Sequence, residues 1–301
     1  MPKIYKYLNP RSAKTLLFDS SNIGIKCTPL DEYNDPYEFF APVNFEDSRN
    51  PEEFTFFYQS LKDEIAGSLA SCFTITPTNI PMWAHYAEEC SGFVLEFDTE
   101  RIKAAVENLG IHFVLNKVTY RDGYDEGLAG TLGHACATGK GRHEAMARNL
   151  VWETAYFTKK TSWEYENEQR LLVPRTVTKS INIGQKEIYI LPIPFHAVTS
   201  IIAGPKMDIS SQITLEDHAR KIGTSYFEMR IGRTVYEPFF IAPGPTIQGK
   251  RHIDQTFIFD GSSLVECNEY CIDCNEPTDQ RKDDSTYCLW CEMENRTEED
   301  F

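Results

Sequence analysis

Four cysteines near the C-terminal end constrain the fold of this chain more than any other feature of its sequence. They form two pairs, Cys271 with Cys274 and Cys288 with Cys291; two residues separate the members of each pair, and thirteen separate the pairs. This spacing lets four thiolates surround one centre at about 2.3 Å, the geometry of tetrahedral structural zinc. Because four protein ligands leave no position for water, we expect the zinc to be structural and to take no part in chemistry.

The segment around these cysteines is strongly acidic. Residues 262–301 contain twelve Asp or Glu and three Lys or Arg, so they hold nine of the fifteen net negative charges of the chain. A segment of this size and composition cannot build a sufficient core, and a metal compensates for that. Since phosphate backbones are bound largely by Lys and Arg, we expect this module to contact a protein. Cys267 is a fifth thiol, which either competes as a ligand or is spare.

The chain as a whole has the composition of an ordinary soluble protein. Its 301 residues are 41% hydrophobic, enough for the core of one large domain. No stretch approaches the roughly 20 apolar residues that span a bilayer, and the N-terminus lacks a signal-peptide core. We therefore expect a cytoplasmic protein without a membrane partner. The isolated cysteines are expected to be reduced, buried thiols: Cys27, Cys72, Cys90 and Cys136.

The hydrophobic patterns predict an α+β domain over residues 1–245, with helices inserted between many short strands. Helices are expected over 51–66, 100–109, 142–160 and 213–222, and strands over 23–28, 68–75, 93–98, 111–120, 170–173, 188–191, 198–202 and 227–231. The glycine-rich stretch 130–141, with His134 and His143 in or beside it, is expected to be a mobile loop. Residues 246–261 are predicted to be a linker, and residues 262–301 the zinc-binding module.

Three short blocks mix aromatic and ionisable side chains more than strand and helix cores usually need. They are residues 30–36, 82–87 and 163–170. A site that stacks a ring and handles a phosphate or a sugar has this composition. Lys159 and Lys160 form a local basic patch beside the third block. The sequence thus predicts a nucleotide-type site.

Each block also has a structural interpretation. Asn34 and Asp35 can build a turn before a proline, because their side chains bond to nearby backbone groups. Trp83 can be a packing anchor, and His85 an ordinary core or surface histidine. The acidic residues of the third block can form a solvated ion-pair strand with Arg170, although the neighbouring aromatics favour partial burial.

The order of the blocks resembles a widespread bacterial family of uncharacterised domains, and the resemblance covers about residues 3–240. It is carried by Lys6-Tyr7, Asn34-Asp35-Pro36 with Glu38, Met82 to Ala87, Gly92-Phe93, Glu96-Phe97-Asp98, Lys160 with Trp163, Tyr165 to Arg170, and Ile201 to Gly204. The resemblance implies a distant relation to ADP-ribosyltransferases, and members often occur in phage-defence or toxin-like settings. The implied fold is an ADP-ribosyltransferase-like mixed sheet with inserted helices, followed here by the small four-cysteine zinc module.

The resemblance also implies NAD as a substrate. Cleavage of the nicotinamide bond passes through an oxocarbenium-like state, which requires a carboxylate near the ribose and an aromatic ring on the nicotinamide. Predicted catalytic residues are Glu168, Glu166, Tyr86 and His85, and predicted cofactor-binding residues are Lys6, Tyr7, Asn34, Asp35, Trp83 and Arg170. Glu166 and Glu168 would share one face if they lay on a strand. Arg170 would then either meet phosphate or orient a glutamate.

Three functional hypotheses follow. The first is an NAD-dependent ADP-ribosyltransferase-like toxin or phage-defence effector that modifies a nucleic acid or a protein and is compatible with an antitoxin or another protein partner. The second is a non-catalytic module that senses a nucleotide or a phage protein and uses the zinc module as an adaptor. The third is a metal-dependent nuclease with Asp35, Glu38, Glu166 and Glu168, whose carboxylates lack the compact spacing of a two-metal site.

Overall fold

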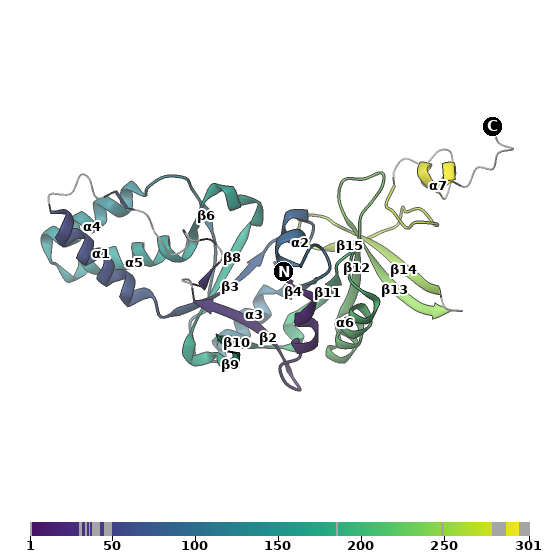
Figure 1. The fold of residues 1–301 in the computed structure, drawn as a ribbon, viewed down its shortest axis with the longest axis horizontal. Helices are drawn as coiled ribbons and strands as arrows, with labels where there is room; N and C mark the ends of the chain where they lie inside the picture. Colours follow the sequence, from purple (N-terminus) through teal and green to yellow (C-terminus); the bar gives the residue numbers. More distant parts are fainter. Residues whose placement is uncertain are drawn as a thin grey trace. The chain divides into compact units, whose positions relative to one another are not determined.

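A computed structural model describes residues 2–29, 32–33, 35, 37, 43–44, 50–184, 186–247, 250–278 and 287–294. Its fold is mixed α/β, with strands arranged in a mixed sheet (Figure 1). The chain divides into two compact units. Unit 1 contains residues 1–23, 74–105 and 193–301, and unit 2 contains residues 24–73 and 106–192. The domain boundaries expected at residues 245 and 261 stay predictions.

Seven strands form the sheet of unit 1, in the order β15-β14-β13-β12-β11-β4-β1. Their bounds are β1 (Lys3–Leu8), β4 (Phe93–Asp98), β11 (Val198–Ala203), β12 (Ser225–Arg230), β13 (Phe239–Ile247), β14 (Lys250–Phe259) and β15 (Leu264–Cys267). Neighbours are antiparallel except β11 and β12, which are parallel. Parallel neighbours need a long crossover, which α6 (Ile209–Ile222) supplies. Every residue of β4 is buried, as a central strand requires.

Short helices complete unit 1. They are α2 (Ile80–Tyr86), α3 (Thr99–Glu107), α7 (Leu289–Glu294) and the 3-10 helices η1 (Pro10–Thr15) and η5 (Phe195–Ala197). The Asn79 side chain accepts a hydrogen bond from the Met82 backbone N–H at 3.1 Å, and this cap starts α2. A proline follows at the second helical position, where no hydrogen-bond donor is needed. The cap therefore fixes where the second aromatic block begins.

Unit 2 contains a smaller set of strands. Their order is β3-β2-β10-β9, with β8 beside β3 and β5 beside β8. The bounds are β2 (Asn22–Pro29), β3 (Ser68–Thr74), β5 (Val114–Lys117), β8 (Glu168–Pro174), β9 (Lys179–Ile183) and β10 (Lys186–Pro194). A separate parallel pair joins β6 (Thr119–Tyr120) to β7 (Thr158–Lys159). The 3-10 helices η3 (Thr161–Glu166) and η4 (Arg175–Val177) flank β8 in sequence.

Three helices of unit 2 pack against one another: α1 (Pro51–Ile65), α4 (Glu126–Thr138) and α5 (Gly141–Phe157) (Figure 1). The apolar stripe predicted for α1 is confirmed, because Phe54, Tyr58, Leu61 and Ile65 are buried. These side chains join residues of α4 and α5 in a single core cluster. Within the described ranges, no helix combines the length and hydrophobicity that a membrane span requires.

The expectation of a mobile loop over 130–141 is wrong. Most of that stretch belongs to α4, which begins where Asp125 accepts a hydrogen bond from the Leu128 N–H at 3.0 Å. It ends at Gly139, whose φ of 56° closes the helix. Glycine in a helix interior costs about 1 kcal/mol relative to alanine. The buried side chains of Leu128 and Leu132 more than offset that cost.

Candidate functional site

The residues predicted for a nucleotide site are divided between the two units. Unit 1 holds Lys6, Tyr7, Trp83, His85 and Tyr86, and unit 2 holds Asp35, Glu166, Glu168 and Arg170. Asn34, like Glu38, lies outside the described residues. The geometry below is given for each unit by itself.

In unit 1, Trp83 and Tyr7 are buried in the core. The Trp83 indole Nε1 donates a hydrogen bond to the Pro77 carbonyl at 2.7 Å, and its ring meets the Tyr7 ring edge-on at 5.2 Å between centroids. The Tyr7 hydroxyl donates to the Thr76 carbonyl at 3.2 Å, and burial raises its pKa. These contacts match the packing-anchor interpretation. His85, by contrast, is exposed.

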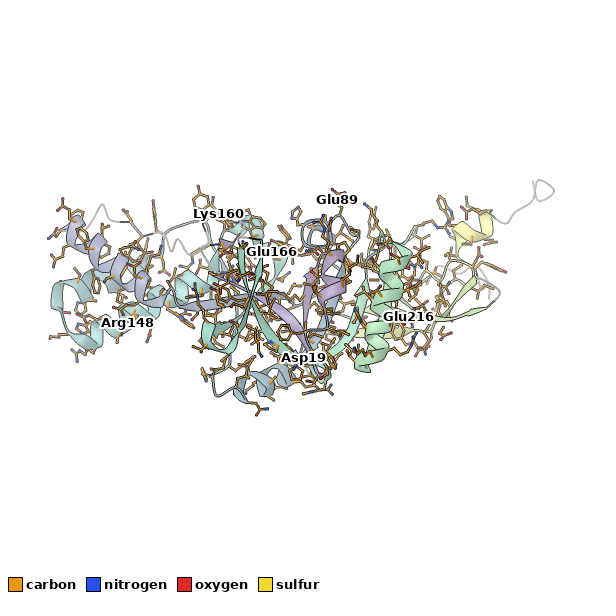
Figure 2. All side chains as sticks on the ribbon, turned by 60° about the horizontal axis from the view of Figure 1, so that its bottom comes forward. Asp19, Glu89, Arg148, Lys160, Glu166 and Glu216 are labelled. Atoms are coloured by element: carbon orange, nitrogen blue, oxygen red, sulfur yellow. The ribbon has the colours of Figure 1, made fainter. Side chains whose placement is uncertain are left out.

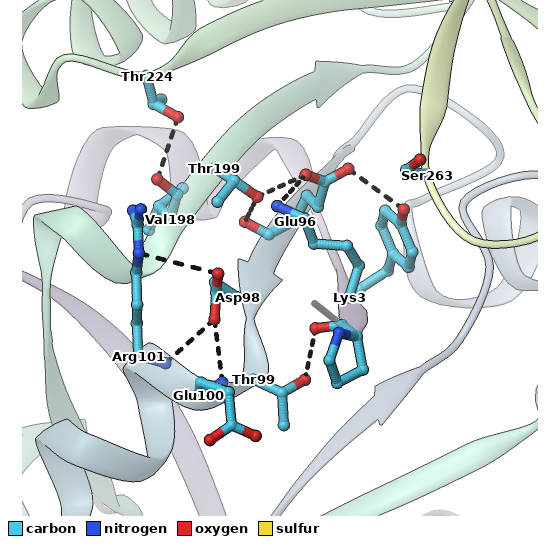
Figure 3. A network of polar contacts seen from close by, with 12 residues as sticks. Lys3, Glu96, Asp98, Thr99, Glu100, Arg101, Val198, Thr199, Thr224 and Ser263 are labelled. Carbon is cyan, nitrogen blue, oxygen red and sulfur yellow. Dashed lines mark hydrogen bonds and ion pairs between the residues drawn. The ribbon is translucent and has the colours of Figure 1, made fainter.

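Glu96, one of the residues that carry the family resemblance, is the centre of a polar network in unit 1 (Figure 3). It is 6% exposed, and its carboxylate accepts a hydrogen bond from the Tyr5 hydroxyl at 3.2 Å and pairs with Lys3 Nζ at 3.1 Å. Thr199 donates a further hydrogen bond. Burial and the Glu96 charge raise the pKa of Tyr5. The network satisfies a buried carboxylate and connects β1, β4 and β11, which is a structural task.

In unit 2, one lysine joins the two predicted catalytic glutamates. Lys159 Nζ lies 2.6 Å from Glu166 Oε2 and 3.3 Å from Glu168 Oε2. All three side chains are at least 95% buried. The two glutamates do not share a strand, because Glu166 ends η3, Asn167 turns at φ 45° and Glu168 begins β8. The carboxylates nevertheless converge on the same ammonium group.

Arg170 closes the network on its other side. Its Nε and its NH2 donate to the two oxygens of Glu168, at 2.7 and 3.1 Å. Its NH1 donates to the Tyr156 carbonyl at 2.9 Å, and its guanidinium lies 5.5 Å from the centroid of the Tyr33 ring. Arg170 is fully buried, so the ion pairs of the third block are not solvated. In this arrangement Arg170 orients a glutamate.

The electrostatics of the network decide what Glu168 can do. Burial by itself raises the pKa of Glu168, but the charges of Arg170 and Lys159 lower it to about 2. Such a carboxylate is ionised at neutral pH and is a poor proton acceptor. Both of its oxygens already accept hydrogen bonds. Its clearest role in the structure is to position Lys159.

Lys159 also lines a cavity of about 630 Å³ within unit 2. Among the residues that the structure describes, the other cations of the lining are Lys62, Arg121 and Lys160, and the acid is Asp122. The lining includes three tyrosines: Tyr37, Tyr58 and Tyr124. Figure 2 labels Lys160, which is exposed, and Glu166, which is buried and in contact with Lys159. The cavity thus combines positive charge with aromatic surface.

Several contacts shape this lining. Lys160 Nζ lies 5.0 Å from the Tyr37 ring centroid, and Lys62 Nζ lies 5.7 Å from that of Tyr58. Burial lowers the pKa of Lys62. Asp35 accepts a hydrogen bond from the Tyr37 N–H at 2.9 Å and so forms the turn that carries Tyr37. The other Asp35 oxygen is buried without a hydrogen-bond partner among the described residues.

Sequence reasoning found only part of this cavity. The basic pair Lys159-Lys160 pointed to it, whereas Lys62 and Arg121 were missed. Arg121 stands four residues before Asp125, with which it forms an ion pair, and this spacing before a helix was an available signal. Lys62 carries no such signal, because it comes from a distant helix.

The four cysteines of the two pairs gather in unit 1. Their Sγ atoms lie within 4.8 Å of one another, and Cys274 Sγ is 3.8 Å from Cys288 Sγ. Tetrahedral zinc with bonds of about 2.3 Å separates its sulfurs by about 3.8 Å, so the donor set fits a metal ion. Cys267 is not a member of the group, and its Sγ contacts the Glu269 carbonyl.

Neighbouring groups suit thiolate ligands. The Arg233 guanidinium donates a hydrogen bond to Cys291 Sγ at 3.2 Å, and the Cys291 N–H donates to Cys288 Sγ at 3.4 Å. Burial raises the pKa of Cys271, but backbone N–H groups lower it to about 7. The pKa values of Cys274 and Cys291 are raised instead, by burial and by contact with the other thiols. Glu276 accepts from both backbone N–H groups of Thr234 and Val235, at 2.6 and 3.2 Å. The cysteine module is thereby fastened to the loop before β13.

Part of the chain is similar to a known protein family. Residues 82–171 match the profile of DUF2971, a family described as a protein of unknown function. The matched stretch includes the second and third aromatic blocks and extends from α2 to β8. Neither the search of curated proteins nor the search of solved structures gave a significant match.

Proposed function

We propose that unit 2 binds a nucleotide in the cavity beside Lys159. The observation that carries the proposal is the lining of this cavity of about 630 Å³, where the described residues include four cationic side chains, three tyrosines and one acid. Lys159 and Arg121 also form ion pairs with acids outside the lining, whereas Lys160 forms no ion pair with a described residue. Pockets for small molecules typically enclose about 300–1,000 Å³. Lys and Arg bind phosphate, and tyrosine rings stack on a base. The same lining would repel a cationic ligand and would leave an apolar ligand beside unsatisfied charges.

Lys160 is the cation best placed to meet a phosphate. Its side chain is exposed, and it forms no ion pair with any residue that the structure describes. Lys159 is different, because Glu166 and Glu168 already compensate its charge. We assign the buried network a positioning role: it fixes β7 and thereby the wall from which Lys160 projects.

Calorimetric titration of the full chain with ADP tests this proposal. We expect binding that Lys160→Ala weakens by about tenfold, the effect of losing about 1.4 kcal/mol from a charged contact. Lys179→Ala is the matched control, because Lys179 is exposed on β9 and outside the cavity lining. Absence of ADP binding at millimolar concentrations, or equal weakening by both variants, would overturn the proposal.

A second candidate function is NAD-dependent ADP-ribosyl transfer on an ADP-ribosyltransferase-like fold. The supporting observation is that Glu168 is ionised and contacts a lysine of the cavity wall, so a negative charge lies near the proposed ligand. A toxin or defence role, a nucleic-acid or protein acceptor and a protein partner such as an antitoxin belong to this proposal. Its catalytic set also includes His85 and Tyr86, which belong to unit 1.

Nicotinamide release separates the two candidates. A transferase releases nicotinamide from NAD in the presence of a cell lysate that supplies acceptors, and Glu166→Gln and Glu168→Gln abolish release while nucleotide binding persists. A binding module gives no release, although it binds ADP. Circular dichroism of each variant identifies a loss of release that comes from unfolding.

For the cysteine module we propose structural zinc. Four thiolates are the soft donor set that favours zinc over magnesium or calcium. All four are protein ligands, so the metal would hold α7 against the turn of residues 271–274 and bind no substrate.

A further inference from the structure

A second cavity of about 430 Å³ lies next to the proposed nucleotide site in unit 2. The two cavities share three lining residues: Arg121, Thr154 and Thr158. Thr158 and Thr119 are partners in the parallel pair β6–β7, and the Arg121 N–H donates to the Lys159 carbonyl at 3.0 Å. The wall between the cavities is therefore fixed by backbone pairing.

The second cavity differs from the first in its charge. Among the described residues, its lining has two cations, Lys117 and Arg121, and two acids, Asp125 and Glu153, whose charges balance. The other polar lining groups are an amide and three threonine hydroxyls: Asn116, Thr119, Thr154 and Thr158. A lining that contains both donors and acceptors suits the hydroxyl groups of a sugar, whereas Lys160 of the larger cavity, which forms no ion pair with a described residue, suits phosphates.

Three side chains of the second cavity have unused hydrogen-bonding capacity. Asn116, Lys117 and Glu153 form no side-chain hydrogen bond or ion pair with the residues that the structure describes. Asn116 and Lys117 are nevertheless held in place, because their backbones pair with Arg170 and Gln169 of β8. The second cavity is thus bounded on one side by β5, which pairs with the strand that carries the buried ion pair.

We infer that the ligand is a nucleoside diphosphate whose terminal phosphate carries a second sugar. This inference rests on the proposed nucleotide site. The base and the phosphates occupy the larger cavity, and the second sugar occupies the smaller one. Arg121 lies at the junction and contacts the phosphates, with Asp125 holding its guanidinium from the opposite side. Glu153 and Asn116 bind sugar hydroxyls.

The test compares each nucleoside diphosphate with its sugar ester by calorimetric titration of the full chain, using ADP with ADP-ribose and UDP with UDP-glucose. For at least one pair, we expect the ester to bind about tenfold or more tightly than the diphosphate. Glu153→Gln and Asn116→Ala should remove this gain and leave diphosphate affinity unchanged. Glu144→Gln, on the same helix but outside both linings, is the matched control and should change neither affinity.

The outcomes separate this inference from the function it rests on. If the diphosphates bind and their esters gain nothing, the sugar cavity is overturned and the nucleotide site stands. If Glu153→Gln weakens diphosphate and ester equally, the assignment of sugar to the smaller cavity is likewise overturned. If neither diphosphates nor esters bind, the nucleotide proposal itself fails.

Discussion

The guanidinium of Arg170 and the carboxylate of Glu168 form two parallel hydrogen bonds, of 2.7 and 3.1 Å, in the interior of unit 2. The two residues are two positions apart on β8, so their side chains leave the same face of the strand. Arg170 has no exposed surface, and Glu168 is 4% exposed. Removal of one partner from such a pair leaves the other as an uncompensated buried charge, which is far more damaging than loss of a surface ion pair.

We predict that Glu168→Gln lowers the free energy of unfolding by about 3–5 kcal/mol at pH 7. Urea denaturation followed by circular dichroism measures the change. Glu164→Gln is the control on the neighbouring 3-10 helix, and its exposed side chain should give a change within about 0.5 kcal/mol. Equal effects of the two variants would contradict a buried role for Glu168.

The difference in stability between wild type and Glu168→Gln should depend on pH. Because the pKa of Glu168 is lowered from 4.5 to about 2 by folding, its ionised form stabilises the protein above pH 4.5. That contribution is lost as the pH falls from 4.5 towards 2, so the wild type should approach the variant over this range. Urea titrations at several pH values test this, and a constant difference would exclude ionised Glu168 as the cause.

Local sequence patterns predicted local structure well. The stripe of α1 and the strand β4 follow from the spacing of apolar side chains, and both appear where expected. The prediction of a loop around Gly130 was wrong, because the burial of apolar side chains of α4 outweighed the low helix propensity of glycine. Lys159 contacts both glutamates because the backbone is left-handed at Asn167. The alternation of side chains along a strand, on which the prediction for Glu166 and Glu168 was based, does not predict such a turn.

The cavity was harder to predict than the elements around it. Lys62, in the last turn of α1, and Lys160, just after β7, are almost a hundred positions apart, yet they line the same space. Such convergence arises from helix packing, and a single sequence carries no periodic signal for it. The cysteine cluster could be predicted from the sequence, because the spacing within and between its two cysteine pairs determines most of its geometry.

Removal of the metal should disorganise the cysteine module. We predict one zinc ion per chain by elemental analysis, and Cys288→Ser should lower the zinc content and the melting temperature. Trp290, on α7 beside Arg233, should report the loss through its fluorescence. Cys267→Ser should retain the metal, because this thiol lies outside the cluster. Retention of zinc by Cys288→Ser would contradict the assignment.

The buried indole of Trp83 should matter for stability. Trp83→Phe removes the hydrogen bond to the Pro77 carbonyl and leaves a void, so we expect a loss of about 1–3 kcal/mol in the free energy of unfolding. Trp290→Phe is the same substitution at a side chain that is 45% exposed, and its effect should be smaller. The comparison by urea denaturation decides whether Trp83 is a packing anchor.

Gly92 and Gly204 belong to the blocks that carry the family resemblance, and the close approach of their backbones gives a steric reason for glycine there. The Gly204 N–H donates to the Gly92 carbonyl at 2.8 Å, which brings two backbone segments together. A Cβ on Gly204 would collide with the Cys90 carbonyl oxygen and lie 2.7 Å from that of Gly92. Backbone atoms cannot rotate away as side chains do, so the β11 end would have to move.

We therefore predict that Gly204→Ala lowers the free energy of unfolding by about 3 kcal/mol or more. Gly67→Ala is the matched control, because a Cβ added there would have open space around it, with no neighbouring atom within 4 Å. By reducing the freedom of the unfolded chain, that change should be neutral or should stabilise by up to about 1 kcal/mol. Urea denaturation of both variants measures the contrast. Tolerance of alanine at Gly204 would show that the approach of the two segments is looser than the structure has it, and the steric reason for glycine in that block would fail.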